Sequence, residues 1–152
     1  MCICSSCVLA SWGGRFKNMA WTVALSYVPE HDFVLCSYDV VLRDERDAIR
    51  WRREVSAEFR RIGRIPVDTL IKLDGLIVKP SGARGYGEQR AILVEQFCRR
   101  SYRFGGDRST RTSVYTSSVL TGAPANVYAT YDEALRALLQ DRLRESPMEP
   151  LR

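Results

Sequence analysis

The sequence contains only one histidine, and it has no long apolar run. The histidine, His31, stands in a Pro-Glu-His-Asp turn pattern without a partner motif, which argues against Ser-His-Asp or Cys-His catalysis. No apolar run reaches the roughly 18 residues of a membrane span, and the phosphate-binding pattern G-x-x-x-x-G-K-S/T is absent. We therefore predict no membrane span, no catalytic residue and no cofactor.

The cysteines do not form the pattern of a disulfide framework. Three of the five lie within the first seven residues, whereas Cys36 and Cys98 lie in apolar segments, where cysteine behaves as a small apolar side chain. The C-x-C-x-x-C start lacks a fourth ligand for a closed zinc site, so we predict no metal; metal binding or acylation of these cysteines is a second interpretation. This cysteine usage is typical of a reducing compartment, and we predict a cytoplasmic protein.

Acidic residues are too few to balance the arginines, and the net charge is +5. Residues 43–64 carry eight Arg against five acidic residues, and residues 79–111 carry eight basic residues against three. We interpret these segments as solvated helix faces, because a high isoelectric point alone does not indicate a nucleic-acid groove. Nucleic acid is therefore not the expected partner, and the sequence leaves the oligomeric state open.

The length of 152 residues predicts one domain. Residues 1–18 differ in composition from the rest, and Met19 directly precedes the first strand pattern. We interpret residues 1–18 as a disordered or mis-assigned extension, with Met19 as a candidate start. The domain then spans residues 19–144, and residues 145–152 form a flexible tail.

Strand and helix patterns alternate along the chain, which predicts an α/β domain. The near-continuous apolar segment 67–78 is typical of a central strand covered on both faces. We expect a mostly parallel sheet of about five strands with an antiparallel N-terminal hairpin and helices packed on it. Residues 108–121 favour a strand by propensity. The other expected strands are 21–28, 33–42, 101–106 and 126–129, and the expected helices are 44–62, 86–100 and 131–143.

Two segments carry a resemblance to a known family. L-D-G-L-I-V-K-P-S-G at 73–82 is a strand that ends in a turn before a helix, and L-T-G-A-P-A-N-V-Y-A-T-Y-D-E-A-L-R-A-L-L at 120–139 is a helix end, a short strand and a capped helix. With the element order, about residues 20–143 resemble the STAS domain of anti-sigma factor antagonists. Uncharacterised bacterial STAS-like proteins with a D-G-L-x-V-x-P turn are the nearer match. The resemblance implies that residues 109–121 are helical, against their propensity.

The resemblance also implies a function. In antagonists of this family a partner kinase phosphorylates the turn serine and so switches partner binding, and Ser81 stands in that position. We therefore expect a non-catalytic regulatory module with a protein partner, such as an anti-sigma-type kinase. Lys79 and Pro80 stand where the family tends to have Asp and Ser, which changes the charge that a kinase would meet. A simpler alternative is a plain turn in which Ser81 caps the next helix.

The same loop is basic and rich in glycine. A helix N-terminus presents unpaired N–H groups that favour an anion. An alternative function is therefore the binding of a small anionic ligand or a lipid. Asp74, Glu88 and Asp107 show no spacing that pairs them for catalysis. The residues predicted to bind an anion or a partner are Lys79, Gly82, Arg84, Arg103, Arg108 and Arg111.

Overall fold

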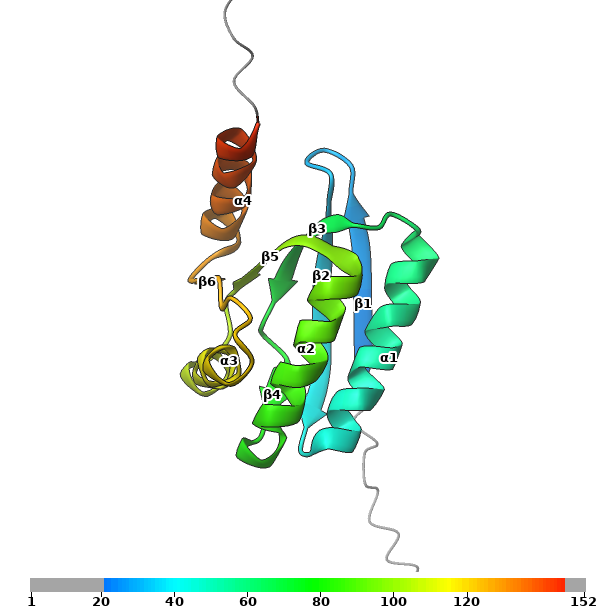
Figure 1. Ribbon diagram of the computed structural model, residues 1–152, viewed down its shortest axis with the longest axis vertical. Helices are drawn as coiled ribbons and strands as arrows, with labels where there is room; N and C mark the ends of the chain where they lie inside the picture. Colours follow the sequence, from blue (N-terminus) through cyan, green and yellow to red (C-terminus); the bar gives the residue numbers. More distant parts are fainter. Residues whose placement is uncertain (1–20, 147–152) are drawn as a thin grey trace, which may run out of the picture.

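The computed structural model of the protein describes residues 21–146, in which six strands form one sheet and four α-helices pack against it (Figure 1). The expected extension at 1–18, the candidate start Met19 and residues 147–152 of the expected tail lie outside the described residues. The strands are β1 (Thr22–Val28), β2 (Phe33–Leu42), β3 (Val67–Lys72), β4 (Leu76–Val78), β5 (Cys98–Phe104) and β6 (Val127–Tyr128). The helices are α1 (Glu45–Ile62), α2 (Ala83–Phe97), α3 (Arg108–Thr121) and α4 (Tyr131–Glu145), with a 3-10 turn at Pro80–Gly82.

The sheet is mixed, with the strand order β1-β2-β3-β5-β6. The β1–β2 hairpin is antiparallel, and the pairs β2–β3, β3–β5 and β5–β6 are parallel. The predicted fold class is therefore confirmed: the domain is α/β, with mostly parallel strands after an antiparallel N-terminal hairpin. No helix within the described residues is long and apolar enough to span a membrane.

The expected single strand at 67–78 is wrong in one respect, because the chain breaks it into β3 and β4. Both pieces pair with β2: β3 with its first half and β4 with Val40–Leu42. Gly75 makes the step between them with φ +85°, and its carbonyl oxygen accepts a hydrogen bond from the amide of Val40. A Cβ at this position would lie 2.4 Å from the carbonyl oxygen of Tyr38, so the break requires glycine.

Helix α1 begins and ends where its sequence predicts. The Asp44 side chain accepts a hydrogen bond from the amide of Asp47, and Gly63 closes the helix in the left-handed conformation. The apolar stripe of α1 is buried against the sheet and α2. Trp51 and Phe59 are part of it, and the Phe59 ring stacks on Phe97 at 5.0 Å between centroids.

The boundary between α2 and β5 differs from the expectation. Helix α2 ends at Phe97, and β5 begins at the next residue, three positions before the expected strand start. Cys98 pairs with Val67, and Arg100 donates hydrogen bonds to Asp68. These partners are about thirty residues earlier in the chain, so the local pattern could not show that the basic pair Arg99–Arg100 belongs to a strand.

Residues 108–121 form helix α3, as the family resemblance implies and against strand propensity. Asp107 caps it by accepting from the amide of Thr110. Hydroxyl groups inside the helix donate back to carbonyls one turn earlier, as Thr112 does to Arg108, so they do not compete with the helix. The helix packs closely on α2 at Gly87, where a Cβ would lie 2.9 Å from Cβ of Ser117.

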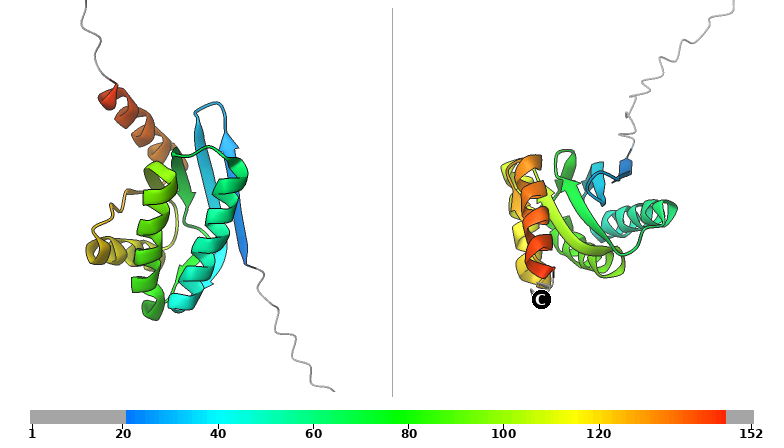
Figure 2. Two further views of the ribbon diagram at one scale, coloured as in Figure 1. Left: turned by 45° about the vertical axis from the view of Figure 1, so that its right-hand side comes forward. Right: turned by 90° about the horizontal axis from the view of Figure 1, so that it is seen from above.

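The two faces of the sheet are covered differently. Helices α1 and α2 lie side by side over one face, and α4 packs over β3, β5 and β6 (Figures 1 and 2). The α4 cluster brings Ala134 and Leu138 against Phe33, Leu70 and Phe104. Side chains alternate along β5, so Phe104 faces α4 whereas Arg103 faces the α2 side.

A buried acid fastens α4 to the sheet. Asp68 has no exposed surface and accepts hydrogen bonds from Arg100 at 3.2 Å and from Arg142 at 2.7 Å. Arg142 also donates to the backbone carbonyls of His31 and Asp32 in the β1–β2 turn. One arginine therefore links α4, β3 and the hairpin.

Candidate functional site

The predicted turn lies at the carboxyl end of the parallel strands. Strand β4 ends at Val78 opposite Leu42, the last residue of β2, and the amide of Lys79 donates to the Leu42 carbonyl at 2.9 Å. The 3-10 turn and then α2 follow at once, next to the start of α1 (Figure 1). Open α/β sheets place ligand and partner sites at this margin.

Ser81 is exposed, and its hydroxyl donates a hydrogen bond to the backbone carbonyl of Arg43. Gly82 is the N-cap residue of α2, and no side chain caps that helix. The alternative in which Ser81 caps the helix is therefore wrong. The hydroxyl instead connects the turn to the loop that leads into α1.

Glycines let this turn pack against the start of α1. A Cβ on Gly82 would lie 2.6 Å from the Leu42 carbonyl oxygen, and a Cβ on Gly85 would lie 3.0 Å from Cα of Glu45. Gly82 is buried, and its amide donates to the Lys79 carbonyl at 2.8 Å. The Gly82 amide is thus already used inside the turn.

Two of the predicted basic residues are exposed at the turn. Lys79 precedes it, and Arg84 lies in the first turn of α2, where its Nε donates to Glu88 at 3.1 Å. The first turn of α2 contains no acidic residue. We call Arg43, Lys79, Ser81 and Arg84 the turn surface.

Arg108 and Arg111 belong to the first turns of α3, which lies against β4. The hydroxyl of Thr110 donates to the Leu76 carbonyl at 2.9 Å, and that of Ser113 donates to the Val78 carbonyl at 3.4 Å. Arg108 is exposed, and Arg111 is partly buried. Arg108 and Arg111 therefore lie on α3, which packs beside β4, and β4 leads directly into the turn surface.

Arg103 is separate from the other predicted residues. Its side chain is only 1% exposed, and it lies inside the domain with Arg90 of α2. Sequence reasoning missed Arg90, although the spacing of Tyr86, Arg90, Leu93 and Phe97 places all four on one face of a helix. That spacing is the signal by which the buried arginine could have been found.

The nucleophiles and carboxylates near these residues are held in other roles. Glu88 binds Arg84, and Asp107 caps α3, where the hydrogen bond from the amide of Thr110 lowers the pKa of the carboxyl. Burial raises the pKa of the Cys36 thiol well above its usual range, and it raises that of Cys98 to about 11. A raised thiol pKa is the opposite of what a nucleophile needs.

No protein-family model matches the sequence, and the search of curated proteins finds no match either. The resemblance to the STAS domain therefore stays a prediction from the two segments and the element order described above.

Proposed function

We propose that the protein is a non-catalytic regulatory module of the STAS type, which binds a protein partner through the turn surface and is switched at Ser81. The observation that carries the proposal is the hydrogen bond between the exposed Ser81 hydroxyl and the Arg43 carbonyl. This single bond joins two neighbouring loops at the margin where such domains present their binding residues. A change at one hydroxyl would therefore alter both loops.

Phosphorylation gives this bond a physical consequence. A phosphoserine oxygen has no hydrogen to donate to Arg43, and the group adds a charge of about −1.5 to −2 at neutral pH. Arg43, Lys79 and Arg84 attract that charge, as do the positive starts of α1 and α2. The turn would no longer donate to the Arg43 carbonyl, and the shape offered to a partner would change.

A binding experiment tests the proposal with two serines. The Ser81→Asp variant replaces the hydroxyl by a negative charge, and Ser109→Asp places the same charge on an exposed serine of α3. A partner captured by the wild type is identified by mass spectrometry, purified, and titrated against each variant. We expect Ser81→Asp to change its Kd at least about tenfold, or about 1.4 kcal/mol, and Ser109→Asp to leave it within about twofold. Equal affinity for all three proteins would refute the serine switch.

A second candidate function is the binding of an anionic lipid or small ligand at the same surface. Among the four α-helices of the described residues, α2 alone begins without a capping side chain, whereas Asp44, Asp107 and Thr130 cap the others. Co-sedimentation with vesicles of anionic or of neutral phospholipid distinguishes this function. Binding to the anionic vesicles that Lys79→Gln abolishes would favour it, and no binding to either would exclude the lipid.

A further inference from the structure

A small cavity lies inside the domain, between the sheet and the helices α1 and α2 that cover one of its faces. Its volume is about 20 Å³, and its wall includes Cys36, Tyr38, Trp51, Tyr86, Arg90 and Arg103. The two arginines come from different elements, α2 and β5. Both residues are almost completely buried: Arg90 exposes 2% of its surface and Arg103 exposes 1%.

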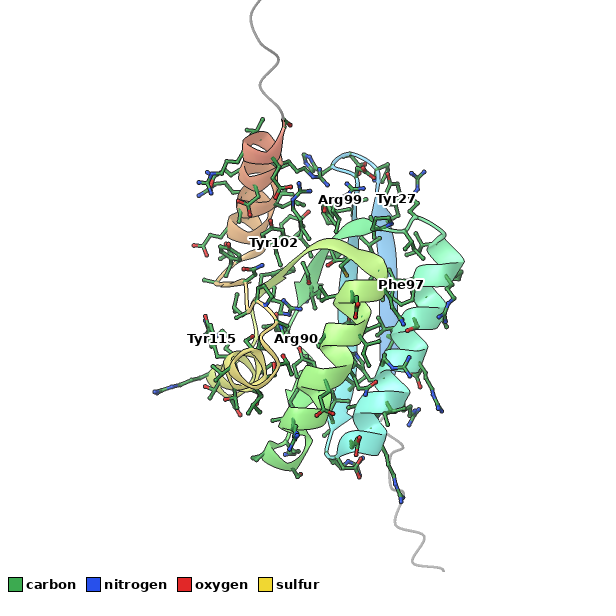
Figure 3. All side chains as sticks on the ribbon, viewed as in Figure 1. Tyr27, Arg90, Phe97, Arg99, Tyr102 and Tyr115 are labelled. Atoms are coloured by element: carbon green, nitrogen blue, oxygen red, sulfur yellow. The ribbon has the colours of Figure 1, made fainter. Side chains whose placement is uncertain are left out.

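Backbone carbonyls of the loop after α3 hold one end of each guanidinium. Arg90 donates to Pro124 at 3.0 Å, and Arg103 donates to Ala125 at 3.1 Å (Figure 3, where Arg90 lies between α2 and α3). Nη2 of Arg90 also donates to the Ser118 hydroxyl at 2.8 Å and to the Ala123 carbonyl at 3.5 Å. Some donors remain unused. Within residues 21–146, Nε of Arg90, Nε and Nη2 of Arg103, and the buried hydroxyl of Ser101 have no hydrogen-bond partner.

Nothing negative faces these donors in the described part of the chain. No acidic residue lines the cavity, and the remaining polar groups on its wall are donors or neutral. Burial raises the pKa of Cys36 and of Tyr38, so both stay protonated at neutral pH. Burial and the charge of Arg103 lower the pKa of Arg90 to about 10, which still leaves it charged. Two adjacent buried cations without a counter-charge are costly.

We propose that this cavity binds a small monovalent anion of halide size between Arg90 and Arg103. The leftover N–H groups supply charge-assisted hydrogen bonds to it, and the Trp51 indole N–H, which is also unpartnered in residues 21–146, supplies another donor. A cavity needs about 10–15 Å³ to hold one water molecule. The observed volume therefore fits one ion of about that size and is too small for a phosphate or an organic acid.

A second pocket adjoins the inner cavity. It has a volume of about 220 Å³ and shares Val94, Ser101 and Arg103 with that cavity. Arg99 and Arg100 line it and attract anions, and Glu145 at its rim is bound to Arg100. None of the four residues of the turn surface lines the cavity, so the proposed site does not depend on the proposed switch.

Thermal unfolding tests the site after the protein has been refolded in chloride-free sodium gluconate. At constant ionic strength, replacing gluconate by chloride at a hundredfold excess over the Kd should raise the Tm of the wild type by about 8 °C. Arg103→Gln should lose most of that rise. Arg53→Gln removes an exposed arginine of α1 and should keep it.

Diffraction from wild-type crystals grown in bromide decides the question without any variant. An anomalous peak between the two guanidinium groups would support the proposal. The proposal would be overturned by equal Tm values in chloride and gluconate, or by a cavity in those crystals that shows water density alone. A rise that Arg53→Gln loses equally would also overturn it, because the effect would then come from surface charge.

Discussion

Ser81 donates its hydroxyl hydrogen to the carbonyl of Arg43, a residue 38 positions earlier in the chain. The bond closes the gap between the 3-10 turn and the loop before α1, where Gly82 and Gly85 already bring the two backbones close. The sequence places Ser81 in a turn but does not show its acceptor, because the acceptor is a backbone carbonyl and any residue supplies one.

Removing this hydroxyl should loosen the two loops without unfolding the domain. We expect Ser81→Ala to lower the free energy of unfolding by about 0.5–1.5 kcal/mol, the usual net worth of one hydrogen bond. Urea titration measures this value. The control Ser109→Ala removes an exposed hydroxyl of α3 and should cost less than about 0.5 kcal/mol. An equal loss in both variants would mean that the bond to Arg43 contributes nothing.

Asp68 should be among the most sensitive positions of the domain. Asp68→Asn removes the charge that Arg100 and Arg142 share in the interior, and breaking a buried ion pair costs about 3–5 kcal/mol. Asp132→Asn, on the exposed first turn of α4, should cost less than about 1 kcal/mol. Chemical denaturation of the two variants compares them. A small loss for Asp68→Asn would show that α4 is held by its apolar contacts alone.

Two glycines separate the effect of backbone strain from that of space. Gly75 and Gly122 have similar φ angles, +85° and +73°, but a Cβ on Gly75 would lie 2.4 Å from the Tyr38 carbonyl oxygen and one on Gly122 meets nothing within 4 Å. Gly122→Ala should therefore cost only the left-handed conformation, about 1–2 kcal/mol, and Gly75→Ala should cost clearly more. Equal losses in thermal unfolding would mean that the β3–β4 break relaxes to accept a side chain.

The local sequence pattern is sufficient to predict a helix where its capping residues and its apolar periodicity agree. Asp44 with Gly63 delimits α1, and Thr130 begins α4, so these helices could be read directly from the sequence. The break in 67–78 could not, because it depends on the space beside Tyr38, which only the paired strand defines.

At the candidate site, too, the local sequence does not show which contacts form between distant residues. Lys79 and Arg84 flank the turn in sequence, and both are exposed there. Arg103 is also basic and lies near the end of β5. Because side chains alternate along this strand, Arg103 points into the domain, where it is covered by α2 and by the loop at residues 123–125. Composition describes how many cations a segment has. Which of them meets solvent depends on contacts that lie far apart in the chain.

The Cys98 thiol should make the protein less stable in mildly alkaline solution. The pKa of the Cys98 thiol is about 11 in the folded protein because of its burial, whereas a thiol in an unfolded chain has a pKa of about 8.5. As the pH rises through about 8.5, the unfolded chain loses protons that the folded protein keeps, so the free energy of unfolding falls. Urea titrations between about pH 7.5 and 9.5, below the usual range of tyrosine and lysine, measure the slope. Cys98→Ala should make the slope shallower, whereas Ser109→Ala should leave it unchanged. A slope that Cys98→Ala does not alter would mean that the thiol titrates alike in the folded and unfolded chain.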